Sequence, residues 1–236
     1  MRRQPDAVEQ MDLPDCDPQL LERTYRQFWL VNRVVSGWRS LYRQRIRPLL
    51  PAGGPASILD IGCGGGDITT ALARWAHADG LQVRVLGIDA DERAYRYAAQ
   101  HAEHRDLPAG ALEFRQAYSH ELLAELGRFD VVVSNHLLHH LDGQQLQGLW
   151  QDSASLARRL ALHADIRRSR LALALFGAGT LPLAGSSFIR RDGLASIRRS
   201  FNHVELARQL PAGWRAETAA PFRNLAVYQP QAPHEA

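Results

Sequence analysis

The stretch ILDIGCGGGD, residues 58–67, decides the fold, because it joins an apolar strand to a glycine-rich turn. Four glycines between residues 62 and 66 let the chain turn tightly and bring bare backbone close to a ligand. A dinucleotide fingerprint needs a further glycine where this chain has Asp67, and a phosphate-binding P-loop needs a lysine, which the chain lacks. Both phosphate-binding interpretations are therefore weakened.

Two carboxylates near this loop indicate the charge of the ligand. Asp60, two residues before the turn, places negative charge where a pyrophosphate would lie, and it favours a cationic ligand instead. Asp89 ends the next apolar stretch, VLGIDAD, where a carboxylate can accept hydrogen bonds from both hydroxyls of a ribose. The loop and the acids together predict a nucleoside ligand that carries no phosphate.

From residue 57 onward, strand and helix patterns alternate, which is typical of parallel strands joined by helical crossovers. The last two apolar stretches are separated only by a short turn around Arg223, so they predict an antiparallel pair. The sequence thus predicts an α/β, Rossmann-like fold with a seven-stranded, mostly parallel sheet and a C-terminal antiparallel hairpin. The expected strands are 57–61, 81–89, 111–117, 129–135, 160–166, 214–222 and 224–230.

The segment before the loop has a different pattern. Residues 19–50 carry aromatic and apolar side chains at helical spacing, with a break at Gly37, and the Pro/Gly stretch 51–55 ends them. Open sheets leave one side of the ligand uncovered, and a reacting site has to exclude water. We therefore expect residues 1–50 to form a helical lid segment and residues 51–236 to form the ligand-binding core.

Three motifs, in order, resemble those of the class I S-adenosylmethionine-dependent methyltransferases. LDIGCGGG resembles their first motif, GIDAD their acidic second motif, and FDVVVSNHLLHHL their fourth-strand motif, so the resemblance covers residues 56 to about 166. The N-terminal YRQFWLVNRVVSGWRSLYR resembles the segment before the core in quinone-biosynthesis methyltransferases. The tail ALFGAGTLPLAGSSFIRRDGLASIRRSF is similar to small bacterial methyltransferases that act on phenolic or resorcinol-type lipids.

This resemblance implies S-adenosylmethionine as the cofactor and a small, apolar phenol or quinol as the methyl acceptor, with oxygen favoured over carbon as the methylated atom. After the third strand the chain reads RQAYSHE, without the acidic residue that many relatives use to bind adenine. Arg33 is expected to pair with the carboxylate of the cofactor. The expected cofactor-binding residues are Asp60, Gly62, Cys63, Gly64, Asp67, Asp89, Ala90, Ala117, Tyr118, Asn135 and Arg33.

Histidines follow the fourth strand, where open α/β sheets bind ligands. Methyl transfer needs a group that takes a proton from the acceptor, and we expect His139 as that base, with His140 second. Both histidines have a structural alternative as packing or capping residues. No carboxylate pair accompanies them in the sequence, so no metal is expected. The expected acceptor-binding residues are Tyr25, Trp29 and His136.

The charge and composition of the chain narrow its partners. Its net charge is only +3 despite a pI near 9.2, and all of its basic residues other than histidine are arginines, mixed with apolar residues as on amphipathic helices. Two widely separated cysteines and the lack of a long apolar run favour a cytoplasmic protein without a transmembrane segment. Nucleic acid is not favoured as a partner, and the oligomeric state stays open.

Three other functions fit parts of the sequence. An RNA methyltransferase would explain the arginines, but base-amine methylation commonly uses a proline and aromatic turn where this chain has Asn135-His136-Leu137-Leu138. A nicotinamide oxidoreductase conflicts with Asp67. A catalytically inactive cofactor-binding module is the third alternative, although the loop glycines and Asp89 are all present.

Overall fold

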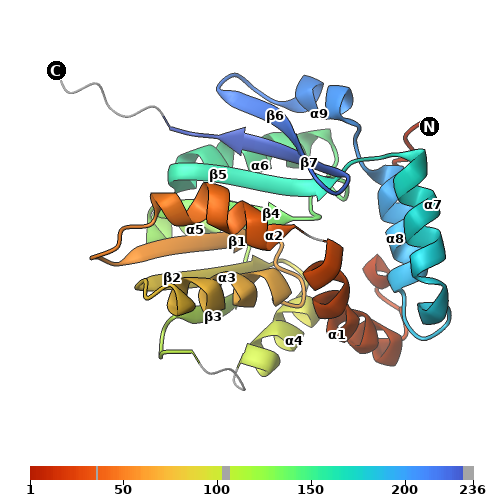
Figure 1. The fold of residues 1–236 in the computed structure, drawn as a ribbon, viewed down its shortest axis with the longest axis horizontal. Coiled ribbons are helices and arrows are strands. Elements are labelled where there is room, and N and C mark those ends of the chain that lie inside the picture. The colour runs from red at the N-terminus through yellow and green to blue at the C-terminus, as the bar shows by residue number, and fades with distance from the viewer. Residues whose placement is uncertain (36, 103–106, 231–236) are drawn as a thin grey trace.

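A seven-stranded sheet with helices on both faces forms the centre of the computed structural model, which describes residues 1–35, 37–102 and 107–230 (Figure 1). The strand order is β3-β2-β1-β4-β5-β7-β6, and β7 runs antiparallel to both of its neighbours. The predicted fold class, with its mostly parallel sheet and C-terminal hairpin, is confirmed. The strands are β1 (Ala56–Ile61), β2 (Val83–Asp89), β3 (Leu112–Gln116), β4 (Phe129–Asn135), β5 (Ala157–Ile166), β6 (Trp214–Ala219) and β7 (Arg223–Tyr228).

Local chemistry explains where several helices begin. At the start of α6, the backbone N–H of Gln145 donates to the Asp142 carboxylate and the Asp142 N–H donates to the Gln145 side chain, each at 2.9 Å. Asn202 and Glu205 make the same reciprocal pair at α9. The helices are α1 (Pro18–Val35), α2 (Trp38–Leu41), α3 (Asp67–Ala78), α4 (Glu92–Ala102), α5 (Ser119–Leu126), α6 (Gly143–Leu156), α7 (Arg170–Gly179), α8 (Ile189–Arg199) and α9 (His203–Gln209).

Both faces of the sheet are buried, as the near-continuous apolar strands require. In β1, Ile58 packs into one apolar cluster and its neighbour Leu59 packs into the other, because successive strand residues point to opposite faces. Trp38, on α2, is fully buried in the first cluster together with side chains from the sheet. Residues 38–50 therefore belong to the core, and only the part up to Val35 has the position expected of a lid.

Helices α1, α7 and α8 gather at one end of the sheet, where the parallel strands reach their carboxyl ends (Figure 1). A short 3-10 helix, η1 (Gln10–Asp12), joins this group, because the backbone N–H groups of Gln10 and Met11 donate to the Asp192 carboxylate at 2.8 and 2.9 Å. The N-terminal residues are thus anchored on α8 and cover the end of the sheet where ligands bind in α/β folds. Within the described residues, no helix combines the length and the apolar character that crossing a bilayer requires.

Candidate active site

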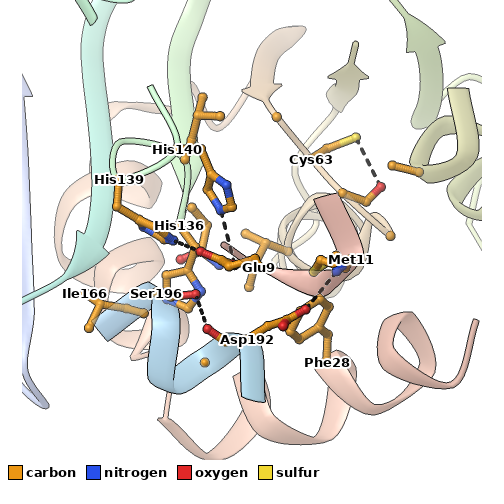
Figure 2. A pocket seen from close by; sticks show the side chains of 18 of the residues that line it. Glu9, Met11, Phe28, Cys63, His136, His139, His140, Ile166, Asp192 and Ser196 are labelled. Atoms are coloured by element: carbon orange, nitrogen blue, oxygen red, sulfur yellow. Dashed lines mark hydrogen bonds and ion pairs between the residues drawn. The ribbon is translucent and has the colours of Figure 1, made fainter. Parts of the chain in front are cut away.

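A cavity of about 1210 Å³ lies at this end of the sheet. Its walls come from the glycine loop, from the ends of β2 and β4, and from η1, α7 and α8 (Figure 2). Of the predicted site residues, it brings together Tyr25, Asp60, Gly62, Cys63, Gly64, Asp67, Asp89, Ala90, Ala117, Tyr118, Asn135, His136, His139 and His140. The side chains of Trp29 and Arg33 lie outside the described residues.

The glycine loop is held against the end of β2 by backbone contacts. Gly62 and Cys63 donate their N–H groups to the Ile88 carbonyl at 2.8 and 3.0 Å, and Gly64 donates to the Asp89 carboxylate at 2.8 Å. Gly64 has a φ of +55°, and a side chain there would meet no atom within 4 Å. The space beside this backbone is open to the cavity, as close approach by a ligand requires.

Asp89 is held with its carboxylate at the edge of this space. Its second oxygen accepts from the Asp91 N–H at 2.9 Å. Burial raises the pKa of Asp89, and the two backbone donors oppose that rise. Each carboxylate oxygen offers more than one lone pair, so both remain able to accept from a diol such as a ribose. The geometry therefore fits the role predicted for Asp89.

Asp60 supplies the test of a cationic ligand. One carboxylate oxygen accepts from the Thr69 hydroxyl at 2.7 Å, while the other, Oδ1, is buried and has no hydrogen-bond partner among the described residues. Burial raises the pKa of Asp60 to about 7. A buried carboxylate with an unpaired oxygen is costly, and a cationic ligand removes that cost. The unpaired carboxylate oxygen of Asp60 therefore fits a cofactor with an amino and a sulfonium group.

The wall predicted to contact adenine contains no acidic side chain from the third strand. Ala90 and Ala117 line it, and Tyr118 is 59% exposed with its ring 5.5 Å from that of His120. His120 was not predicted as a site residue. It lies two residues after Tyr118, at the start of α5, and apart from being a histidine it shows no sequence pattern that marks a site residue.

Asn135 and His136 occupy the end of β4. The Asn135 side-chain oxygen accepts from the Trp38 indole N–H at 2.9 Å, and it accepts from Arg223 at 3.2 Å. His136 has a φ of +58°, in the left-handed region that is uncommon for residues other than glycine. Such a conformation often accompanies functional positions, and here it lies on the cavity wall.

His139 is buried between the carboxylates of Asp165 and Glu9, and Figure 2 shows its contact with Glu9. Its Nδ1 lies 2.7 Å from Asp165, and its Nε2 lies 3.5 Å from Oε1 of Glu9. Burial alone would lower the pKa of His139, but Asp165 and Glu9 overcome it and raise the value to about 9. The ring is therefore protonated at neutral pH, and it accepts a further proton only after it has lost this one.

His140 shares Glu9 with its neighbour. Its Nε2 lies 3.7 Å from Oε2 of Glu9, and its Nδ1 lies 3.1 Å from Asp12. Glu9 also pairs with Arg199 at 3.3 Å. Burial alone would raise the pKa of Glu9, but its contacts with His139 and His140 lower it. Glu9 and Asp12 come from the N-terminal residues, more than a hundred positions from the histidines, and no local pattern marked them.

Glu9, His139 and His140 offer ligand atoms within 4.8 Å of one another, which makes them the candidate for a metal among the described residues. Imidazole and carboxylate are donors that zinc accepts. The protonated state of His139 opposes this use, because the Nε2 that would bind the metal carries a proton. The expected absence of a metal therefore stays a prediction.

The remaining part of the cavity, here called the apolar arm, runs between α7, α8 and the turn before β7. It is lined mainly by aliphatic and aromatic side chains, as hydrophobic ligand sites usually are. Its residues include Ile166, Ala172, Phe176, Leu183, Ile197 and Phe222.

Comparisons with known proteins find a methyltransferase domain in this chain. Residues 58–159 match the Methyltransferase domain family. Ubiquinone biosynthesis O-methyltransferase of Caulobacter vibrioides is 40% identical over 86 residues, which cover 36% of this chain and 31% of that protein. The enzyme of the same name from Maricaulis maris is 29% identical over 165 residues, covering 66% of this chain and 61% of that one. The chain thus matches about a third of the length of the first of these relatives.

Solved structures show the same fold. The plantazolicin methyltransferase BpumL in complex with SAH superposes with a TM-score of 0.55 at 14% identity, covering 89% of this chain and 96% of that one. A SAM-dependent methyltransferase from Aquifex aeolicus gives a TM-score of 0.57 at 14% identity, with 89% and 97% covered. The matched domain at residues 58–159, the similar O-methyltransferases and the shared fold support the predicted class I S-adenosylmethionine-dependent methyltransferase. S-Adenosylmethionine, the predicted cofactor, is the cofactor of this class.

Proposed function

We propose that this protein transfers a methyl group from S-adenosylmethionine to an oxygen of a small, apolar acceptor of the phenol or quinol type. The observation that carries the proposal is one continuous cavity that joins Asp60 and Asp89 to the apolar arm. The relatives named O-methyltransferase favour oxygen as the acceptor atom. When bound, the cofactor would supply a methyl group on a sulfonium centre: the acceptor oxygen would attack the methyl carbon in line with the carbon–sulfur bond, and S-adenosylhomocysteine would leave.

The residues around the glycine loop would hold the cofactor. Asp89 accepts hydrogen bonds from the ribose hydroxyls, and the open backbone at Gly64 allows the nucleoside to lie close. Asp60, with its unpaired buried oxygen, receives the cationic end. Asn135 has its side-chain oxygen occupied by Trp38 and Arg223, which leaves the amide group to donate into the cavity.

His139 is the base in this proposal, and only its neutral ring can act as one. Asp165 fixes the ring through both the side chain and the backbone N–H of His139, the latter at 2.9 Å. Because Glu9 and Asp165 hold the ring as an imidazolium, the active form is the minority neutral ring, and Nε2 is the atom that would take the proton of the acceptor. Activity should therefore rise with pH well above neutrality.

The N-terminal residues would exclude water from the acceptor. Tyr25 is buried and lines the cavity, and η1 places Glu9 and Asp12 over the histidines. A covered site strengthens the charged contacts within it. Opening this cover is expected to admit the acceptor.

Labelled S-adenosylmethionine, incubated with the protein and a panel of phenols, quinols and long-chain resorcinols, tests the proposal. We expect label in an ether of at least one apolar acceptor. The variant Asp79→Asn should transfer label as the wild type does, since Asp79 lies outside the cavity at the end of α3 and contacts Tyr42 and Arg47. Label on a ring carbon would contradict the oxygen assignment, and no transfer to any acceptor would contradict the proposed class of acceptor.

A further inference from the structure

Arg223, the first residue of β7, is a buried cation on the cavity wall. Its side chain is only 3% exposed. Ile166, its neighbour on β5, and Phe222, which precedes it, both belong to the apolar arm. The guanidinium therefore lies where the apolar arm meets the end of β4, between the two parts of the cavity.

The hydrogen-bond partners of this guanidinium among the described residues are neutral. One terminal nitrogen donates to the Asn135 side-chain oxygen at 3.2 Å, and the other lies 3.3 Å from Nε2 of His136. Burial, together with the charge of Arg223, lowers the pKa of His136 to about 3, so this ring is uncharged and its Nε2 accepts. The Nε of Arg223 is buried without a partner.

No carboxylate of the described residues forms an ion pair with Arg223 within 4.0 Å. The negative charge of Asp165 raises the pKa of Arg223, but this carboxylate is hydrogen-bonded to Nδ1 of His139 at 2.7 Å. Burial lowers the pKa of Arg223 to about 10, which still leaves it charged at neutral pH. The charge thus enters the cavity without a counter-ion of its own.

A second buried arginine shows the ordinary arrangement. Arg168 is 6% exposed and pairs with the Glu205 carboxylate through both terminal nitrogens. Buried charges are normally compensated in this way, since removing a charge from water without a partner is costly. The difference between the two arginines is that Arg168 lies outside the cavity and Arg223 lines it.

We infer that Arg223 binds an anionic oxygen of the methyl acceptor and so selects acidic acceptors. The oxygen is either a carboxylate on the ring, which leaves the phenolic proton for His139, or the phenol itself, which then binds already ionised and needs no base. This inference rests on the proposed function. The position of His136 supports it, because its Nε2 lies 3.3 Å from one terminal nitrogen of Arg223 and helps to hold the guanidinium on the cavity wall. A planar guanidinium also suits such oxygens through paired hydrogen bonds.

Binding of two matched probes tests the inference without turnover. The probes are 3-pentylphenol and its 2-carboxylated counterpart, titrated by calorimetry into full-length protein saturated with S-adenosylhomocysteine. Two buffers of different ionisation enthalpy count the protons released to the buffer on binding. The variants are Arg223→Gln, Arg223→Lys and, as control, Arg215→Gln, whose side chain is 55% exposed on β6.

We expect one of two signatures in the wild type. A carboxylate site binds the carboxylated probe at least tenfold more tightly than the phenol, whereas a phenolate site releases about one proton for each phenol bound. Arg223→Gln should abolish either signature. For the carboxylate site, the ratio of the two affinities should fall at least tenfold, which corresponds to about 1.4 kcal/mol; for the phenolate site, the released proton should no longer be detected. Arg215→Gln should behave as the wild type.

Unchanged signatures in Arg223→Gln would overturn the inference. So would weaker S-adenosylhomocysteine binding by this variant, since Arg223 would then serve the cofactor. If Arg223→Gln does not fold, Arg223→Lys decides, because it keeps the charge but loses the fork; an unchanged affinity ratio and proton count would again overturn the inference. Failure of the proposed function shows separately, as absence of methyl transfer by the wild type.

Discussion

The two parts of the cavity differ in how the sequence builds them. The cofactor part comes from one loop and the next strand end, since Asp60, Gly64 and Asp89 lie within 30 residues of one another. The acceptor part combines Glu9, His139, Asp165 and Arg223, which come from the N-terminal segment and three strand ends. The cofactor part can therefore be predicted from neighbouring sequence motifs, whereas the residues of the acceptor part come together only in the folded chain.

The largest expected effect concerns the acceptor part. Replacing His139 by Ala should lower kcat by about 10² to 10⁴, the usual contribution of a general base, and should leave S-adenosylhomocysteine affinity within about twofold. If His139 is the base, wild-type activity rises as pH passes through about 9, because the ring must first lose its proton. His77→Ala, at an exposed position on α3, is the control. Wild-type kcat in both His139→Ala and His140→Ala would refute the base assignment.

Removing Asp165 should damage stability more than any change in the cofactor part. Asp165→Ala leaves His139 without its closest carboxylate, and breaking a buried pair typically costs about 3–5 kcal/mol of unfolding free energy. Urea unfolding at pH 7 measures this. The double variant Asp165→Ala/His139→Ala should lose less than the two single changes predict together. Additive losses would show that the pair does not act as a unit.

The same pair should make stability depend on pH. A histidine whose folded pKa is raised above its unfolded value stabilises the fold below that unfolded value, and the contribution is lost as pH rises through the folded pKa. For His139 the loss runs from about 6.5 to about 9 and amounts to roughly 3 kcal/mol. Unfolding of the wild type and of His139→Gln across this range isolates the effect. Parallel curves for the two proteins would contradict it.

In the cofactor part the expected effect is smaller. Asp89→Ala should weaken S-adenosylhomocysteine binding by roughly 1.5–3 kcal/mol, as expected when hydrogen bonds from hydroxyls to a charged group are lost. Calorimetry measures the affinity, and Asp79→Asn again serves as control. If Asp89→Ala and Gly64→Val both bind as the wild type does, this loop is not the cofactor site.

The smallest effect is expected from added metal. Because His139 is protonated at neutral pH, equilibrium dialysis at pH 7 against zinc should leave less than one ion bound per chain. Methyl transfer should also survive treatment with a chelator. Stoichiometric zinc that is lost in Glu9→Gln would turn the acceptor part into a metal site.

The fold and the cofactor part could be predicted because their signals are local. Apolar alternation gave the strands, and the glycine loop with Asp89 gave the ligand class. In the acceptor part, the prediction reached the histidines after β4 and Tyr25, which all line the cavity. Glu9 lies in a polar N-terminal stretch, and its approach to His139 depends on η1 docking on α8 through Asp192. Asp165 and Arg223 do stand at strand ends, a signal that could have identified them.

The lid also shows the limit of periodicity. Residues 19–50 read as an amphipathic helix pair with a break at Gly37, but Trp38 and Tyr42 of the second part are buried in the core. Within the described part of residues 1–50, the side chains on the cavity wall all come from before Val35. Helical spacing indicates that a face is buried without indicating against what. The role of these first residues as a lid stays a prediction, which deletion of residues 1–16 would test by separating acceptor turnover from cofactor binding.

The attachment of η1 to α8 has a consequence for how the protein could be observed. Asp192 of α8 holds the backbone of Gln10 and Met11, next to Glu9, and α8 also forms a wall of the apolar arm. We therefore expect an occupant of the arm that displaces α8 to draw Glu9 away from the imidazolium and to change the ionisation of His139. The histidine is thus a built-in reporter of occupancy, and its ring nitrogen resonances in NMR should move when an apolar molecule enters the arm, before any chemistry takes place.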